Sequence, residues 1–217
     1  MPNDEQDIAI AYDEWAETYD TDENRTRDLA GVVLRESGLD LEGRKVVEVG
    51  CGTGRNTVWL AEKAAQVTAM DFSKAMLARA KQRVSDPRVR LIQHDARLPW
   101  PITNDSADVV VVMLVLEHIE HLQNFFAEAA RILVTDGTCF VCELHPTRQL
   151  AGSQAQFTCT ATGERRRVHA FMHNILEFVG AALGAGFALK HLGEWRHETD
   201  VADTPRLLSL LLMRNCS

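Results

Sequence analysis

The sequence predicts an α/β fold in which helices cover both faces of a parallel β-sheet. Short β-branched segments alternate with amphipathic segments between residues 45 and 144. Segment 107–113 is strongly apolar, as is typical of a strand buried on both faces. A glycine-rich turn at 50–54 joins the first strand of this region to a helix. Together these observations predict βαβ crossovers.

The size and composition are those of one globular domain. The chain has 217 residues, of which 46% are hydrophobic and 25% are charged, so disordered and collagen-like classes are excluded. We expect a single domain over residues 1–217. The 23 basic and 31 acidic side chains give a net charge of −8, which opposes a phosphate backbone. We therefore expect no nucleic-acid partner.

The chain shows no sign of export or membrane insertion. The first residues are acidic, and no apolar run is long enough to cross a bilayer. The five cysteines have no disulfide-framework spacing, and Cys139 and Cys142 are expected to be buried apolar residues of a strand. We expect a cytoplasmic protein without a membrane partner, either a monomer or a homodimer.

Residues 1–38 are expected to form an N-terminal helical lid. Apolar and aromatic residues at helical spacing place a first helix over 4–23, and a second helix is expected over 25–37 with Gly38 as its C-cap. Strands are expected at 45–49, 66–70, 88–93, 107–113 and 138–144. Helices are expected at 56–63, 74–84 and 122–133. Ser73 is expected to cap the helix that follows it.

The pattern changes after residue 145. Residues 146–170 are expected to form an inserted hairpin near the active site, turning at 162–163. A helix over 171–185 follows, and then two strands at the sheet edge, 187–195 and 205–213, joined by the acidic loop 198–203.

A ligand site is expected where the parallel strands end. Gly50, Gly52 and Gly54 let the backbone approach a ligand next to the free N–H groups of a helix N-terminus. Asp71 follows Gly52 by 19 residues at the end of the next strand, where a carboxylate can bind ribose hydroxyls. Glu48 precedes the turn, and its charge would repel a pyrophosphate and attract a cation.

Segment 46–54, with the sequence VVEVGCGTG, resembles the first motif of the class I S-adenosylmethionine (SAM)-dependent methyltransferases. Asp71 matches the ribose-binding acid of that family, and residues 94–96 match its adenine loop. Segment 114–119 is similar to the family segment after the fourth strand. Segment 12–20 is similar to the N-terminal helix of the ubiquinone/menaquinone methyltransferase-like subgroup, methyltransferase type 11.

This resemblance implies a Rossmann-like, seven-stranded, mostly parallel sheet of order 3-2-1-4-5-7-6, in which strand 7 is antiparallel. It implies SAM as the cofactor and S-adenosylhomocysteine (SAH) as its product. The cofactor-binding residues that it implies are Tyr12, Glu48, Gly50, Cys51, Gly52, Asn56, Asp71, Phe72, Met76, Asp95, Ala96 and Met113. Core packing is the alternative for Met76, and a turn cap is the alternative for Asp95.

Four residues are candidates for the catalytic side of the site: His118, His145, His173 and Tyr19. Methyl transfer from a sulfonium mainly requires alignment and desolvation, and a base helps only where the acceptor loses a proton. A neutral imidazole can accept that proton near pH 7. A structural histidine, or a tyrosine on the apolar face of the first helix, is the alternative. Other candidates for the acceptor pocket are Arg148, Gln149 and Trp195.

The predicted function is SAM-dependent methyl transfer to a nitrogen or oxygen atom of a small-molecule acceptor in specialised metabolism. The alternatives are C-methylation of a quinone-like acceptor and a non-catalytic SAM-binding regulator. An NAD-dependent oxidoreductase is disfavoured because positions 55 and 57 lack the third glycine of the dinucleotide fingerprint. No metal is expected: His145 or His173 could join His118 and His121, but no acid-rich or cysteine-rich cluster completes a site.

Overall fold

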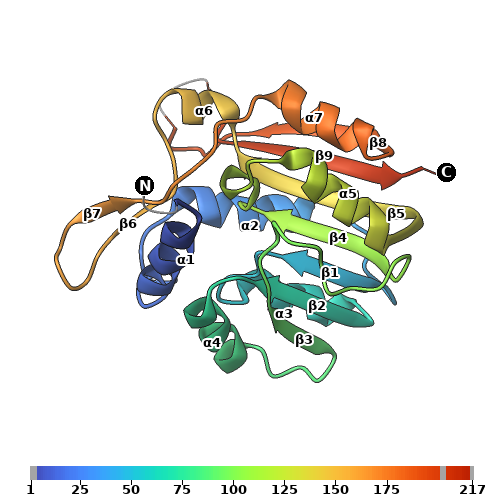
Figure 1. The fold of residues 1–217 in the computed structure, drawn as a ribbon, viewed down its shortest axis with the longest axis horizontal. Coiled ribbons are helices and arrows are strands. Elements are labelled where there is room, and N and C mark those ends of the chain that lie inside the picture. Colours follow the sequence, from blue (N-terminus) through green and yellow to red (C-terminus); the bar gives the residue numbers. More distant parts are fainter. Residues whose placement is uncertain (1–3, 201–203, 216–217) are drawn as a thin grey trace.

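A computed structural model describes residues 4–200 and 204–215 of the chain. Its centre is a seven-stranded sheet of order β3-β2-β1-β4-β5-β9-β8 (Figure 1). The strands are β1 Lys45–Val49, β2 Gln66–Asp71, β3 Val89–Gln93, β4 Ala107–Met113, β5 Leu133–Leu144, β8 Phe187–Trp195 and β9 Leu207–Arg214. Strands β1 to β5 pair in parallel, and β9 is antiparallel to both of its neighbours. Counted within this sheet alone, the order is 3-2-1-4-5-7-6, which confirms the expected class.

Helices cover both faces of the sheet (Figure 1). They are α2 Arg25–Glu36, α3 Arg55–Lys63, α4 Lys74–Arg83, α5 Leu122–Ile132 and α7 Ile175–Gly184. Val110 and Val112 of β4 belong to the core cluster that contains α5 and α7. Val109 and Val111 belong to the cluster that contains α2, α3 and α4. Because successive strand residues point to opposite faces of the sheet, β4 must carry apolar side chains on both faces.

The two strand cysteines follow the same rule. Cys139 lies in the α5–α7 cluster and Cys142 in the opposite cluster, and both are fully buried with free thiols. The expectation that they are buried apolar residues is confirmed. None of the described helices is long and apolar enough to cross a membrane.

Helix α1, Asp4–Trp15, packs beside a separate hairpin of β6 Gln156–Thr158 and β7 Arg165–Arg167 (Figure 1). The Trp15 and Phe157 rings stack with centroids 5.5 Å apart. On the other side of α1, the Asp13 carboxylate accepts hydrogen bonds from Ser73 Oγ at 2.6 Å and Ala75 N at 3.0 Å. Helix α1 is therefore held between this hairpin and the start of α4.

Two helix boundaries differ from the prediction. The first helix ends at Trp15 rather than at residue 23, because Trp15 Nε1 and Thr18 Oγ1 both donate to the Asp22 carboxylate, which folds 16–22 into turns. The helix expected from residue 171 begins at Ile175 instead. Asn174 caps it and exchanges hydrogen bonds with Glu177 in a capping box. His173 therefore precedes the helix.

Two further boundaries differ around β5. This strand begins at Leu133 rather than at residue 138, through a register shift against β4 between Ala107 and Val109. A short helix that was not predicted, α6 Pro146–Leu150, follows β5 because Pro146 occupies its first turn and the His145 side chain caps it. Of the predicted acidic loop, residues 201–203 lie outside the described residues.

Candidate active site

Two adjoining cavities open where the parallel strands end, under α1. The inner cavity is lined by the glycine turn, the end of β2, segment 94–97, and segment 113–115 with His118. The outer cavity, of about 340 Å³, extends toward the β6–β7 hairpin and residues 23–27. Three residues line both cavities: Tyr12, Tyr19 and Leu114. A small pocket along the glycine turn includes Cys51, Arg55 and Asn56.

Gly50 is required by space as well as by backbone conformation. Its φ is +72°, and its N–H donates to the Met70 carbonyl at 2.8 Å. A Cβ at this position would lie 2.3 Å from Cγ2 of Val115. The glycine therefore lets the β1 turn approach the loop that follows β4, which closes the floor of the inner cavity.

Asp71 ends β2 and is buried at the inner cavity. Its carboxylate accepts hydrogen bonds from Gly52 N at 2.8 Å and Ser73 N at 2.9 Å. Burial raises its pKa to about 6, although these backbone donors oppose the shift. Each carboxylate oxygen keeps lone pairs that can accept further hydroxyl donors.

Glu48 lies behind the glycine turn and is not part of either cavity wall. Its side chain faces α3, where Oε2 accepts a hydrogen bond from Thr57 Oγ1 at 2.5 Å. Burial raises its pKa to about 8. The structure thus places the Glu48 carboxyl where it pins α3 to β1, one layer away from the cavity.

Asp95 and its neighbours form the far wall of the inner cavity. Burial acts to raise the pKa of Asp95, but hydrogen bonds from the Arg97 side chain and backbone N–H outweigh it and lower that pKa. In the same wall, Nε2 of His94 is buried and has no hydrogen-bond partner among the described residues. The wall therefore offers an unsatisfied polar atom to a ligand. The inner cavity also has an apolar part, which is formed by Ala96, Phe72, Met76 and Met113.

Burial favours the neutral form of the His118 imidazole, and two hydrogen bonds hold its ring in place. His118 ends the 3₁₀ turn η1, Leu116–His118, which follows β4. Its Nδ1 lies 2.8 Å from the His169 carbonyl, which can only accept, so Nδ1 carries the proton. Nε2 then accepts a hydrogen bond from the Tyr12 hydroxyl at 2.9 Å. Burial lowers the pKa of His118 and raises that of Tyr12.

Sequence reasoning missed two buried acids beside His118. Glu143, in β5, accepts a hydrogen bond from Val115 N at 2.9 Å, and burial raises its pKa to about 8. This bond supports Leu114, whose φ of +58° is unusual for a side chain of that size. Glu117 is 7% exposed and lines the outer cavity, and its Oε2 has no partner among the described residues. The sequence signal that could have found them is a single acidic residue within an otherwise mostly apolar segment, 114–119 for Glu117 and 138–144 for Glu143.

The other two histidine candidates lie outside both cavities. His145 Nδ1 accepts a hydrogen bond from Thr147, and Nε2 lies 3.2 Å from the Glu194 carboxylate. His173 Nε2 bonds to the Ile119 carbonyl at 2.7 Å. Three further candidates also lie away from the cavities: Arg148, Gln149 and Trp195. Within the described residues, no group of three or more His, Cys, Asp or Glu side chains is arranged to hold a metal ion.

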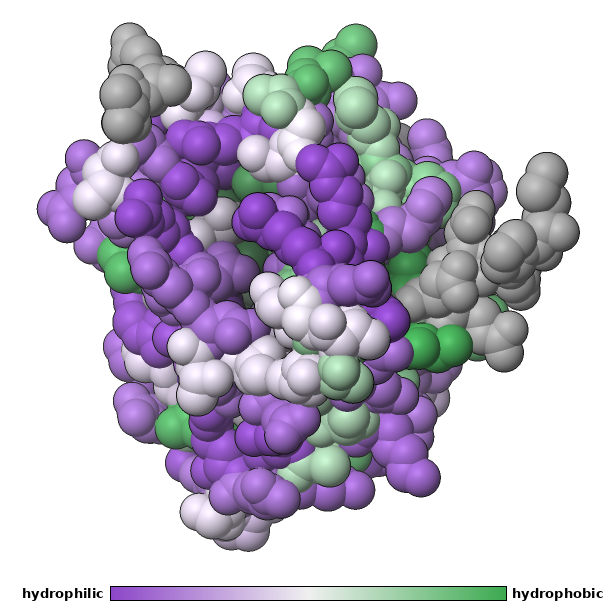
Figure 2. Space-filling view, turned by 90° about the vertical axis from the view of Figure 1, so that its left-hand side faces the viewer, coloured by the Kyte–Doolittle hydropathy of each residue, from purple (hydrophilic) through white to green (hydrophobic). Residues whose placement is uncertain are grey.

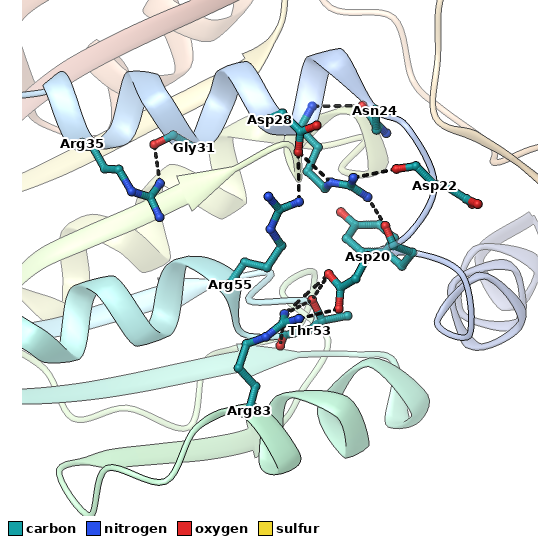
Figure 3. A network of polar contacts seen from close by, with 11 residues as sticks. Asp20, Asp22, Asn24, Asp28, Gly31, Arg35, Thr53, Arg55 and Arg83 are labelled. Carbon is teal, nitrogen blue, oxygen red and sulfur yellow. Dashed lines mark hydrogen bonds and ion pairs between the residues drawn. The ribbon is translucent and has the colours of Figure 1, made fainter.

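A polar network joins the segment that carries Tyr19 to the glycine turn (Figure 3). The Asp20 carboxylate accepts hydrogen bonds from Thr53 Oγ1 at 2.8 Å and from Arg83 Nη2 at 2.7 Å. Arg83 also donates to the Thr53 carbonyl at 2.9 Å. On the same segment, Arg27 donates to the carbonyls of Tyr19 and Asp22. The position of Tyr19 over the cavities is thereby linked to the turn between β1 and α3.

The fold and the site define a Rossmann-like protein of the class I methyltransferase type. Residues 47–141 match the family described as "Methyltransferase domain". The chain is 32% identical over 216 residues to an uncharacterized methyltransferase of Emericella nidulans, covering 82% of this chain and 75% of that protein. It is also 36% identical over 113 residues to the demethylmenaquinone methyltransferase of Tropheryma whipplei, covering 50% of this chain and 46% of that one.

Among solved structures, the DhpI–SAH complex is similar in fold, with a TM-score of 0.74 at 20% identity over 98% of both chains. The chain belongs to the S-adenosylmethionine-dependent methyltransferase family. It is therefore an enzyme that uses SAM, and the alternative of a non-catalytic regulator is set aside.

Proposed function

We propose that the enzyme methylates a nitrogen or oxygen atom of a small molecule, with SAM in the inner cavity and the acceptor in the outer one. The single observation that carries this proposal is the contact of 2.9 Å between the Tyr12 hydroxyl and Nε2 of His118, whose other ring nitrogen is bound to the His169 carbonyl. A base held in this way serves an acceptor that must lose a proton.

The lining of the inner cavity suits SAM. Asp71 would accept the ribose hydroxyls, and Asp95, Ala96 and the unsatisfied Nε2 of His94 would face the adenine end. The pocket along the glycine turn, with Cys51, Gly52 and Asn56, would hold the methionine end. When bound there, SAM supplies a methyl group activated by a sulfonium sulfur.

The protein's own residues would move one proton in this reaction. The acceptor heteroatom would take this methyl group, and the sulfur would leave with the electron pair of the broken carbon–sulfur bond. The proton of the acceptor passes to the Tyr12 hydroxyl, which lines both cavities, and Tyr12 gives its own proton to His118 Nε2. Burial keeps the Tyr12 hydroxyl protonated before the step, because it raises that pKa.

C-methylation of a quinone-like acceptor is the second candidate, and the name of the Tropheryma whipplei relative favours it. The test is a panel of three acceptors, an aromatic amine, a phenol and a 1,4-naphthoquinol, incubated with SAM. The carbon-13 shift of the transferred methyl group separates N-, O- and C-methyl products. We expect an N- or O-methyl product that His118→Gln reduces by about 100-fold or more. A C-methyl product alone would contradict the proposal.

A further inference from the structure

The outer cavity is lined by more basic than acidic side chains. Its lining contains four arginines and two glutamates, although the whole chain carries a net charge of −8. The arginines are Arg25, Arg27, Arg165 and Arg206. Figure 2 shows the side of the molecule that carries α1 and the β6–β7 hairpin, and hydrophilic side chains cover most of it. The occupant of this cavity is therefore met by polar groups.

These arginines differ in how they are already engaged. Arg206 is paired with Asp200, and Arg25 is paired with Glu23. Arg27 donates to two backbone carbonyls and is also paired with Asp28. The guanidinium of Arg165, on β7, has no hydrogen bond or ion pair among the described residues. The outer end of the cavity thus presents a guanidinium that is available to an anion.

The other polar feature is Glu117. Its side chain is more than nine-tenths buried, it lines the outer cavity, and Oε2 has no partner among the described residues. An unpaired buried carboxylate oxygen is costly unless a ligand donates to it. The other carboxylate oxygen of Glu117, Oε1, lies 3.8 Å from Nε2 of His118, so the carboxylate lies beside the proposed base. A donor group bound by Glu117 would therefore be close to the Tyr12–His118 pair.

We infer that the acceptor carries an anionic group at one end, a carboxylate or a phosphate-like group, and an N–H or O–H donor at the other. Arg165 binds the anion, and Glu117 accepts the hydrogen bond from the donor. The aromatic rings of Tyr12, Trp15 and Tyr19 line the same cavity and suit an apolar body. This inference rests on the proposed function, because it takes the outer cavity as the acceptor site.

The test measures binding to the SAH-saturated enzyme by calorimetry and needs no turnover. The probes are 4-hydroxyphenylacetate, 4-hydroxybenzylphosphonate and the neutral 4-hydroxyphenylacetamide. We expect at least one anionic probe to bind about fivefold or more tightly than the neutral one. Arg165→Gln should remove that preference, and Arg167→Gln, a neighbour on β7 that lies outside the cavity lining, should retain it. Whichever of the two anionic probes binds more tightly shows whether the site prefers a carboxylate or a phosphate-like group.

Glu117→Gln should weaken all three probes by about tenfold, since each of them donates through its hydroxyl. Equal binding of anionic and neutral probes, a preference that survives Arg165→Gln, or no binding of any probe to an enzyme that binds SAH would overturn the inference. Failure of methyl transfer with intact probe binding would count against the proposed chemistry and leave the binding result standing.

Discussion

The Tyr12 hydroxyl lies 2.9 Å from Nε2 of His118, and the two rings meet edge to face with centroids 5.4 Å apart. These residues are 106 positions apart in the sequence. The contact joins helix α1 to the turn after β4, directly over the cavity. It makes the N-terminal segment part of the proposed proton path as well as a cover for the site.

Removing this hydroxyl should slow catalysis more than it weakens cofactor binding. Tyr12→Phe keeps the aromatic packing with Trp15 and Phe72 but removes the donor to His118. We expect kcat to fall by about 10- to 100-fold with the SAM affinity changed by less than about twofold. Tyr19→Phe is the comparison, because the Tyr19 hydroxyl has no partner among the described residues. Equal losses in the two variants would contradict the role of Tyr12.

The activity should depend on pH through His118. Burial lowers the pKa of His118 below its ordinary value of about 6.5, and the base is active only when it is neutral. The rate should therefore be constant above about pH 6.5 and should fall as the pH drops through the lowered pKa. A profile of kcat against pH between 5 and 8 measures this limb, and His118→Gln should abolish it. If the fall in kcat at low pH persisted in His118→Gln, another group would be responsible for it.

The close approach at Gly50 gives a prediction about stability. Gly50→Ala introduces a left-handed alanine and a contact of 2.3 Å with Val115. Gly43→Ala is the matched control, since its φ of +70° is similar and no atom lies within 4 Å of the added Cβ. We expect the control to lose about 1 kcal/mol and Gly50→Ala to lose about 2 kcal/mol more. Denaturant unfolding of both variants provides the measurement, and equal losses would show that Val115 yields without cost.

The fold could be predicted from the sequence because its signals are local. The strand periods, the glycine turn and Asp71 at a strand end each lie within a few residues of one another, and parallel strands bring their ends to one edge. The order of the sheet followed from the family resemblance. Helix ends were less predictable, because side-chain caps at Asn174 and His145 decided them.

The acceptor side could not be predicted in the same way. His145 ends a strand at the correct edge, yet its ring turns toward Thr147 and Glu194. Glu143 reaches the loop after β4 only because β5 lies beside β4, a pairing between residues 28 positions apart. Side-chain direction at a strand end depends on such long-range neighbours, which the spacing of residues in one chain does not reveal.

The network around Asp20 should affect cofactor binding more than folding. Asp20→Ala removes the carboxylate that joins the Tyr19 segment to Thr53 and Arg83 (Figure 3). Because this ion pair is partly exposed, we expect a stability loss of less than about 1 kcal/mol. The KM for SAM should rise by about three- to tenfold, since the lid would close less often. Asp40→Ala, which removes an exposed pair with Arg44 outside this network, is the control and should change KM less.

Keeping the Glu48 carboxyl buried has a cost in stability that depends on pH. Burial raises the pKa of Glu48 to about 8, and the unfolded chain has an ordinary glutamate pKa of about 4.3. The stability that comes from this raised pKa is fully present below the unfolded pKa. It is lost as the pH rises through the folded pKa of about 8, because the unfolded chain ionises Glu48 first. Glu48→Gln, which can still accept from Thr57, should therefore gain stability over the wild type between pH 5 and pH 8.

We expect this gain to reach about 2 kcal/mol, measured by thermal unfolding of the ligand-free proteins across that range. Glu62→Gln, at an exposed position on α3, is the control and should show no such trend. Calorimetry on Glu48→Gln should also show weaker binding of SAM above about pH 8, where the wild-type carboxyl is ionised and attracts a cationic ligand. A variant that is more stable but binds SAM less well would show that Glu48 serves the ligand. Unchanged SAM binding would leave it a structural link between β1 and α3.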